Sequence, residues 1–128
     1  MSPADQKNPA YLCGRLLRIL EHAQQVAVNP KATLIDRYYG SASSAPGAVF
    51  GLLFRNGQAH LAKLRTERPG LHTNLQKDVS EVMAGLESWP RTLTLQEQAL
   101  FALGYYHQRM KDFTPKAGAE EQGEDKGV

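Results

Sequence analysis

The sequence has little of what disulfide-linked, metal-binding or membrane proteins require. Cys13 is the only cysteine, which excludes an internal disulfide and any cysteine-based zinc site, and we expect its thiol to be packed and inert. Apolar runs such as residues 48–50 and 52–54 fall far short of the ~20 residues of a membrane span. Residues 1–8 contain no apolar stretch before a cleavage site, so no secretory signal is predicted and the cytoplasm is the expected compartment.

The residue types that carry catalysis are present but scattered. The glycines lack the spacing of a phosphate-binding loop, and the carboxylates form no distinctive acid–base pair. No histidine has a second ligand three or four residues away, as helical metal sites have. The four histidines fall on different expected helices: His22, His60, His72 and His107. The sequence therefore predicts no enzyme activity, no metal site and no cofactor.

Charge is distributed unevenly along the chain. The 128 residues hold 15 Lys+Arg and 13 Asp+Glu, a net charge of +2. Residues 114–128 contain two lysines and four carboxylates, a net charge of −2, which leaves 13 basic and nine acidic side chains, net +4, in residues 1–113. A basic body followed by an acidic tail is therefore predicted, and the tail has the composition of a disordered segment.

Apolar residues recur at three- and four-residue steps through most of the chain, and no segment alternates as a strand would. Expected helices run from Pro9 to the Asn29–Pro30 break, over residues 34–39 after a Thr33 cap, from Pro46 to about Arg68, from the Pro69–Gly70 break to Trp89, and from a Thr94–Glu97 capping box to Phe113. We predict an all-α fold, a compact bundle of about five helices over residues 9–113, with a flexible N-terminus (1–8) and a disordered acidic tail (114–128).

Basic side chains are concentrated on helix faces and ends. Arg15 and Arg18 share the spacing of one stripe, with His22 and Gln25, opposite the apolar face of the first helix. The third helix ends in a basic segment, residues 63–68, where cations also complement the helix dipole. A basic body of this kind makes contact with a phosphate backbone plausible, and nothing in it is suited to reading base sequence.

The last helix places Arg109 beside Tyr105 and Tyr106. Tyrosines near a guanidinium group can stack bases while the charge holds a phosphate. They can equally be core residues with a solvated hydroxyl. Together with Phe101, the two tyrosines are interpreted here as core and interface residues.

Three segments carry a resemblance to a known family. They are residues 36–43 (DRYYGSAS), 60–65 (HLAKLR) and 100–109 (LFALGYYHQR). In this order and spacing they resemble the C-terminal region of the Csd-type large subunit of the type I-C CRISPR surveillance complex, Cascade. The resemblance extends over about residues 9–113. In that family this helical module is similar to a separate small subunit made by internal translation initiation, and a chain that begins at its own Met1 is expected to be that subunit.

The resemblance implies a non-catalytic role in Cascade. Small subunits line the belly of the complex, packing against the large subunit and the backbone subunits that hold the CRISPR RNA, and they contact displaced non-target DNA. A second copy of the chain is a further candidate partner. The nucleic-acid contacts expected inside the matching segments are Arg37, Lys63, Arg65 and Arg109. Those expected on charge alone are Arg15, Arg18 and Arg68. Two alternatives stay open: a purely structural packing subunit of the same complex, and an unrelated cytosolic helical adaptor.

Overall fold

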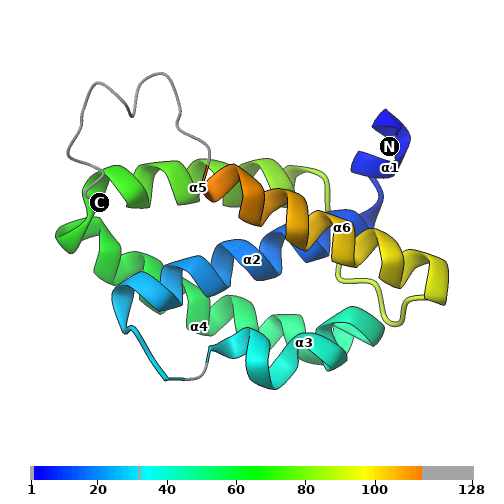
Figure 1. Ribbon diagram of the computed structural model, residues 1–128, viewed down its shortest axis with the longest axis horizontal. Coiled ribbons are helices and arrows are strands. Elements are labelled where there is room, and N and C mark those ends of the chain that lie inside the picture. The colour runs from blue at the N-terminus through cyan, green and yellow to red at the C-terminus, as the bar shows by residue number, and fades with distance from the viewer. Residues whose placement is uncertain (1, 32, 114–128) are drawn as a thin grey trace.

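The computed structural model describes residues 2–31 and 33–113. Within these residues every regular element is a helix, as the sequence predicts (Figure 1). The helices are α1 (Pro3–Gln6), α2 (Pro9–Ala27), α3 (Leu34–Ser44), α4 (Pro46–Glu67), α5 (Pro69–Ala84) and α6 (Leu95–Asp112). None of these helices is long and apolar enough to cross a bilayer. The tail expected at 114–128 lies outside the described residues.

The helix starts expected from the sequence are confirmed. The side chain of Asn8 accepts a hydrogen bond from the backbone N–H of Ala10 at 2.8 Å, at the start of α2. At the start of α6, the Thr94 hydroxyl accepts from the backbone N–H of Glu97 at 3.1 Å, and the Glu97 carboxylate accepts from the backbone N–H of Thr94 at 2.8 Å. The backbone N–H of Thr33 donates to the carboxylate of Asp36 at 2.8 Å. Each cap satisfies N–H groups that the first helical turn leaves without partners.

Three boundaries differ from expectation. A short capped helix, α1, forms within the expected flexible N-terminus. The helix α3 continues through the stretch of small residues to Ser44, whose hydroxyl donates to the carbonyl oxygen of Gly40 at 2.8 Å. The helix α5 ends at Ala84, five residues before Trp89. Gly85 caps α5, and its backbone N–H donates to the carbonyl oxygen of Val82 at 3.0 Å. Beyond this cap, Trp89 stacks on Phe50 of α4 with ring centroids 5.2 Å apart.

The helix α2 runs through the middle of the bundle, with α6 packed along it and α4, α5 and α3 around it (Figure 1). Thirteen of its 19 residues are buried. This is more than a single helix face can contain, because neighbouring helices cover α2 on several sides. Cys13 lies in this core, as expected, and burial raises the pKa of its thiol to about 12. The thiol is therefore protonated and shielded, which is the inert state predicted for it.

Two glycines set the separation between α2 and α6. A Cβ atom on Gly14 would collide with the carbonyl oxygen of Phe101, and one on Gly104 would collide with the carbonyl oxygen of Tyr11. In both cases the obstacle is backbone, which cannot move aside as a flexible side chain can. The two helices therefore touch backbone to backbone at their crossing, and only glycine fits at either position.

Replacing Gly14 by Ala is expected to lower the free energy of unfolding by about 2–3 kcal/mol, because the added methyl group must push two helix backbones apart. The matched control is Gly51→Ala, also in a helix interior but with open space around its Cβ position; it should raise stability by up to about 1 kcal/mol. Urea unfolding followed by circular dichroism measures both. Equal stabilities for the two variants would show that the crossing is not tight.

Candidate nucleic-acid interface

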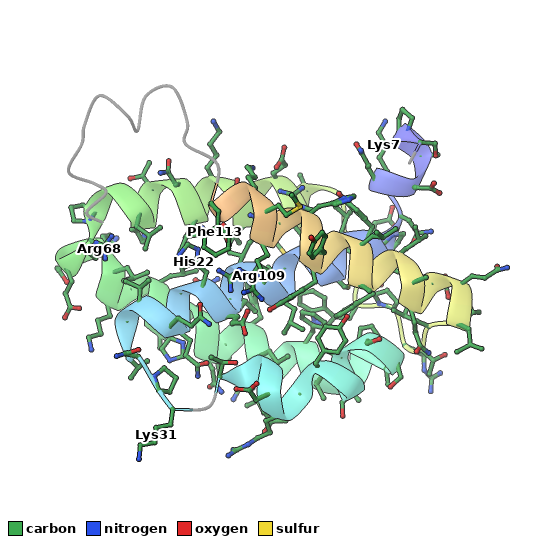
Figure 2. The ribbon with its side chains drawn as sticks, in the orientation of Figure 1. Lys7, His22, Lys31, Arg68, Arg109 and Phe113 are labelled. Carbon is green, nitrogen blue, oxygen red and sulfur yellow. The ribbon has the colours of Figure 1, made fainter. Side chains whose placement is uncertain are left out.

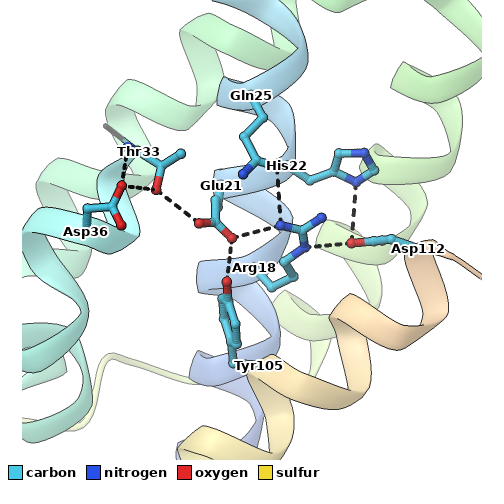
Figure 3. Close-up of polar contacts among 8 residues, drawn as sticks. All are labelled: Arg18, Glu21, His22, Gln25, Thr33, Asp36, Tyr105 and Asp112. Carbon is cyan, nitrogen blue, oxygen red and sulfur yellow. Dashed lines mark hydrogen bonds and ion pairs between the residues drawn. The ribbon is translucent and has the colours of Figure 1, made fainter. Parts of the chain in front are cut away.

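The stripe of Arg15, Arg18, His22 and Gln25 does not face solvent, because α6 and α5 lie against it. This corrects the expectation of a free basic surface on α2. The side chain of Arg18 is only 6% exposed. Its Nη1 donates to Oε1 of Glu21 at 2.8 Å, and its Nε donates to Oδ2 of Asp112 at 2.7 Å (Figure 3). Arg18 therefore joins α2 to the end of α6.

The carboxylate of Glu21 is the centre of this polar cluster. Besides the bond from Arg18, it accepts from the hydroxyl of Tyr105 at 2.6 Å and from the hydroxyl of Thr33 at 3.0 Å (Figure 3). One buried acid thus connects α2, α6 and the segment that precedes α3. Since an unpaired buried charge is very costly, the donors around Glu21 are what allow it to remain in the core.

The same contacts change the protonation behaviour of their members. Burial alone would lower the pKa of Arg18, but its hydrogen bonds to Asp112 and Glu21 raise that pKa above its ordinary value. Burial, together with the hydrogen bond to Glu21, raises the pKa of Tyr105 to about 12. The arginine therefore stays cationic and the phenol stays neutral. Neither is in a state suited to acid–base chemistry near neutral pH.

A second polar cluster fixes Arg15. Its Nε donates to Oε1 of Gln108 and its Nη2 to Oε1 of Glu81, both at 2.9 Å. Gln108 in turn donates to Asp78 at 3.0 Å, and the ammonium of Lys111 reaches the same carboxylate at 2.9 Å. Arg15 is 14% exposed, so it too is occupied inside the bundle.

This second cluster forms one wall of a cavity of about 770 Å³ between α1, α2, α5 and α6. Three cations line the cavity: Lys7, Arg15 and Lys111. The carboxylate of Glu81 pairs with Arg15, and that of Asp78 pairs with Lys111. No group of three or more histidine, cysteine, aspartate or glutamate side chains in the described part of the chain could hold a metal ion.

The remaining predicted cations lie on the outside. Arg37 on α3 and Lys63 and Arg65 on the last turns of α4 are exposed and form no ion pair with any described residue. Arg68 is half-buried at the junction of α4 and α5, near one end of the molecule (Figure 2). The structure thus separates the seven predicted residues into two internal arginines and five nearer the surface.

Arg109 lies on α6, a different helix from the other exposed cations. It is exposed, and its guanidinium carbon lies 5.9 Å from the ring centroid of Phe113 (Figure 2). The tyrosines beside it face opposite ways: Tyr105 points inward to Glu21, while Tyr106 is 57% exposed. Phe101 is fully buried. The core interpretation is confirmed for Phe101 and Tyr105, whereas Tyr106 faces outward.

His60, inside one of the resembling segments, is half-buried and its Nδ1 has no hydrogen-bond partner among the described residues. Burial, and then the charge of Lys63, lower the pKa of His60. The ring is therefore neutral at physiological pH and adds no charge to the basic end of α4.

The comparison with known families decides the identity at the family level. A family model described as "CRISPR-associated protein (Cas_Csd1)" matches residues 3–113, which include all six described helices. The chain belongs to the Cas_Csd1 family. No curated protein matches the sequence. The resemblance inferred from three short segments of this Cas_Csd1 protein is thus confirmed over the whole helical body.

Sequence reasoning about this Cas_Csd1 chain missed the acids that hold its arginines. The spacing of Arg18 and Glu21, one helical turn apart, was a usable signal for their pairing. Asp112 offered none, because its contact with Arg18 depends on how α6 crosses α2. The same is true of Gln108, a buried amide between Arg15 and Asp78.

Replacing Asp112 by Asn should lower the stability of this Cas_Csd1 protein by about 3 kcal/mol, because Arg18 would lose one of its two buried carboxylates. The control is Glu87→Gln on the exposed loop after α5, expected to change stability by less than about 0.5 kcal/mol. Urea unfolding at neutral pH measures both. If Asp112→Asn had the same free energy of unfolding as Glu87→Gln, the ion pair with Asp112 would not be what holds Arg18 in the core.

Proposed function

We propose that the chain is the non-catalytic small subunit of a type I-C Cascade in the cytoplasm. It packs against the large subunit and the backbone subunits that hold the CRISPR RNA, and it stabilises the R-loop by sequence-independent contacts with displaced non-target DNA. The observation that carries this proposal is a Cas_Csd1-family helical body whose cations on α3 and α4 remain exposed and unpaired by its own described carboxylates.

The structure supports a smaller contact set than the seven residues named from sequence. Arg37, Lys63, Arg65 and Arg109 present charge on the surface, and Arg68 is half-buried at the end of α4. The internal Arg15 and Arg18 are held by Glu81, Glu21 and Asp112 and have a structural role. The proposed DNA contacts therefore lie on α3, the end of α4 and α6.

A few contacts of this kind are sufficient for the proposed role. Opening a DNA duplex against a guide RNA exchanges one duplex for another of similar stability. Each lysine or arginine that neutralises a phosphate also releases counterions, a gain that does not depend on base sequence. Small backbone contacts can therefore shift the equilibrium toward the open complex.

A second function of the same class is packing alone, with the exposed cations meeting acidic residues of neighbouring subunits. The alternative of an unrelated helical adaptor is set aside by the family match. Packing and DNA contact differ in the salt dependence they predict for target binding. Only cations that contact DNA release counterions from it, so only their removal changes the salt dependence.

In an assembled complex, replacing Lys63 and Arg65 by Ala should weaken target binding. The plot of log affinity against log salt should become shallower by about 1.4, since each single-strand phosphate contact contributes about 0.7. The matched control exchanges the two residues, Lys63→Arg with Arg65→Lys, which keeps both charges and should keep the slope. Filter binding at several salt concentrations gives both values. An unchanged slope, with target binding reduced only as far as less complex assembles, would instead assign these residues to packing.

A further inference from the structure

The cavity between α1, α2, α5 and α6 lies where the short helix α1 joins α2 (Figure 1). Its volume of about 770 Å³ is within the range of about 300–1,000 Å³ that is usual for small-molecule pockets. A capping box holds α1 together, in which the Ser2 hydroxyl accepts from the backbone N–H of Asp5 at 3.2 Å. This short helix places Pro3, Gln6 and Lys7 along the cavity.

Two cations of the cavity are held in position by buried partners. The Nε of Arg15 donates to the side chain of Gln108, a residue that is 1% exposed. Gln108 and the ammonium of Lys111 both donate to Asp78, which is also buried. A guanidinium has five N–H donors and an ammonium three, so Arg15 and Lys111 keep donors that these buried partners do not use. Donors that are positioned before a ligand arrives lower the cost of binding it.

Glu81 occupies the remaining contact of Arg15. Its side chain is 62% exposed and accepts from Nη2 of Arg15 at 2.9 Å. An ion pair with so exposed a partner is weak, so another anion can take the place of Glu81 at little cost. Arg15 keeps its bond to Gln108 in that exchange, and with it its structural role.

The charges around the cavity suit a doubly charged anion. Lys7 is exposed and forms no ion pair with any described residue, while Asp78 neutralises Lys111. Once Glu81 is displaced, Lys7 and Arg15 are two cations without a paired carboxylate. A phosphate monoester, with a charge of about −1.5 to −2 at pH 7, balances them. A phosphodiester, with a single negative charge, does not.

The rest of the lining suits an apolar or aromatic body attached to the phosphate. Pro3, Leu12 and Ala84 contribute apolar surface. Tyr11 and His107 contribute two rings that meet edge to face, with the Tyr11 hydroxyl 2.8 Å from Nδ1 of His107. Burial raises the pKa of Tyr11, so its phenol stays neutral and adds no negative charge to the cavity. Nucleic-acid bases stack on aromatic side chains of this kind.

We propose that the cavity binds a phosphate monoester of nucleotide size, with the phosphate between Lys7 and Arg15 in the place of the Glu81 carboxylate. Glu81 is then an internal competitor for the site. The proposed DNA contacts on α3, the end of α4 and α6 use other residues, so this proposal goes beyond them and does not depend on them.

Backbone-amide NMR of the full chain, titrated with adenosine monophosphate (AMP), tests the ligand class. AMP should shift the amides of Lys7, Arg15 and Lys111 to saturation. Cyclic AMP has the same base and sugar but a singly charged diester, and should bind about fivefold more weakly, the effect of one unit charge at contact distance in water. Adenosine, without a phosphate, should bind more weakly still. The absence of saturable shifts around the cavity, or equal affinities for AMP and cyclic AMP, would overturn the proposal.

Two substitutions with opposite expected effects test where the phosphate lies. Lys7→Gln should weaken AMP binding about fivefold, because it removes one unit charge. Glu81→Gln should strengthen AMP binding about threefold, because the competing carboxylate is gone. The matched controls are Lys31→Gln, far from Lys7 (Figure 2), and Glu67→Gln at the exposed end of α4, and both should leave the affinity unchanged. The NMR spectrum of each variant shows whether it is folded. An affinity that Lys7→Gln does not lower, or that Glu81→Gln does not raise, would overturn the proposed site.

Discussion

The close approach of α2 and α6 is the constraint on which the rest of the molecule depends. Because Gly14 and Gly104 carry no side chain, the two helix backbones touch. This contact places α6 across the polar stripe of α2, so Arg18 is enclosed and must find its acids inside the bundle. The two glycines allow α2 and α6 to come close together, and the buried ion pairs fix how α6 is placed along α2. A shifted α6 would leave Arg18 without Asp112.

Most of the fold could be predicted from sequence because its signals are local. Each helix cap, such as Asn8 or Thr94, and each apolar repeat depends only on residues close together in the chain. The structure confirms these caps. The early end of α5 was missed although Gly85, at its C-cap, is a local stop signal; only the stacking of Trp89 on Phe50 depends on another helix. The candidate site was predictable only in part. Exposure of Lys63 follows from its place on α4, whereas the burial of Arg18 follows from the crossing with α6, which no local pattern reveals.

The cations of the chain divide into two groups with different roles. Arg15 and Arg18 are neutralised inside the bundle and hold helices together. Lys63 and Arg65 are exposed at the end of α4, where the proposed DNA contacts lie. A small helical subunit can thus use some of its cations for its own stability and others for nucleic acid.

Amide hydrogen exchange under native conditions tests most directly whether the α2–α6 unit is the part of the molecule on which the rest depends. The account predicts that buried amides of α2 and those of α6 around Gly104 exchange slowest and only through global unfolding, while those of α1 exchange fastest. Asp112→Asn should accelerate the slow amides of α2 and α6 together. If α2 and α6 exchanged independently, with α6 opening while α2 stayed protected, the account would be contradicted.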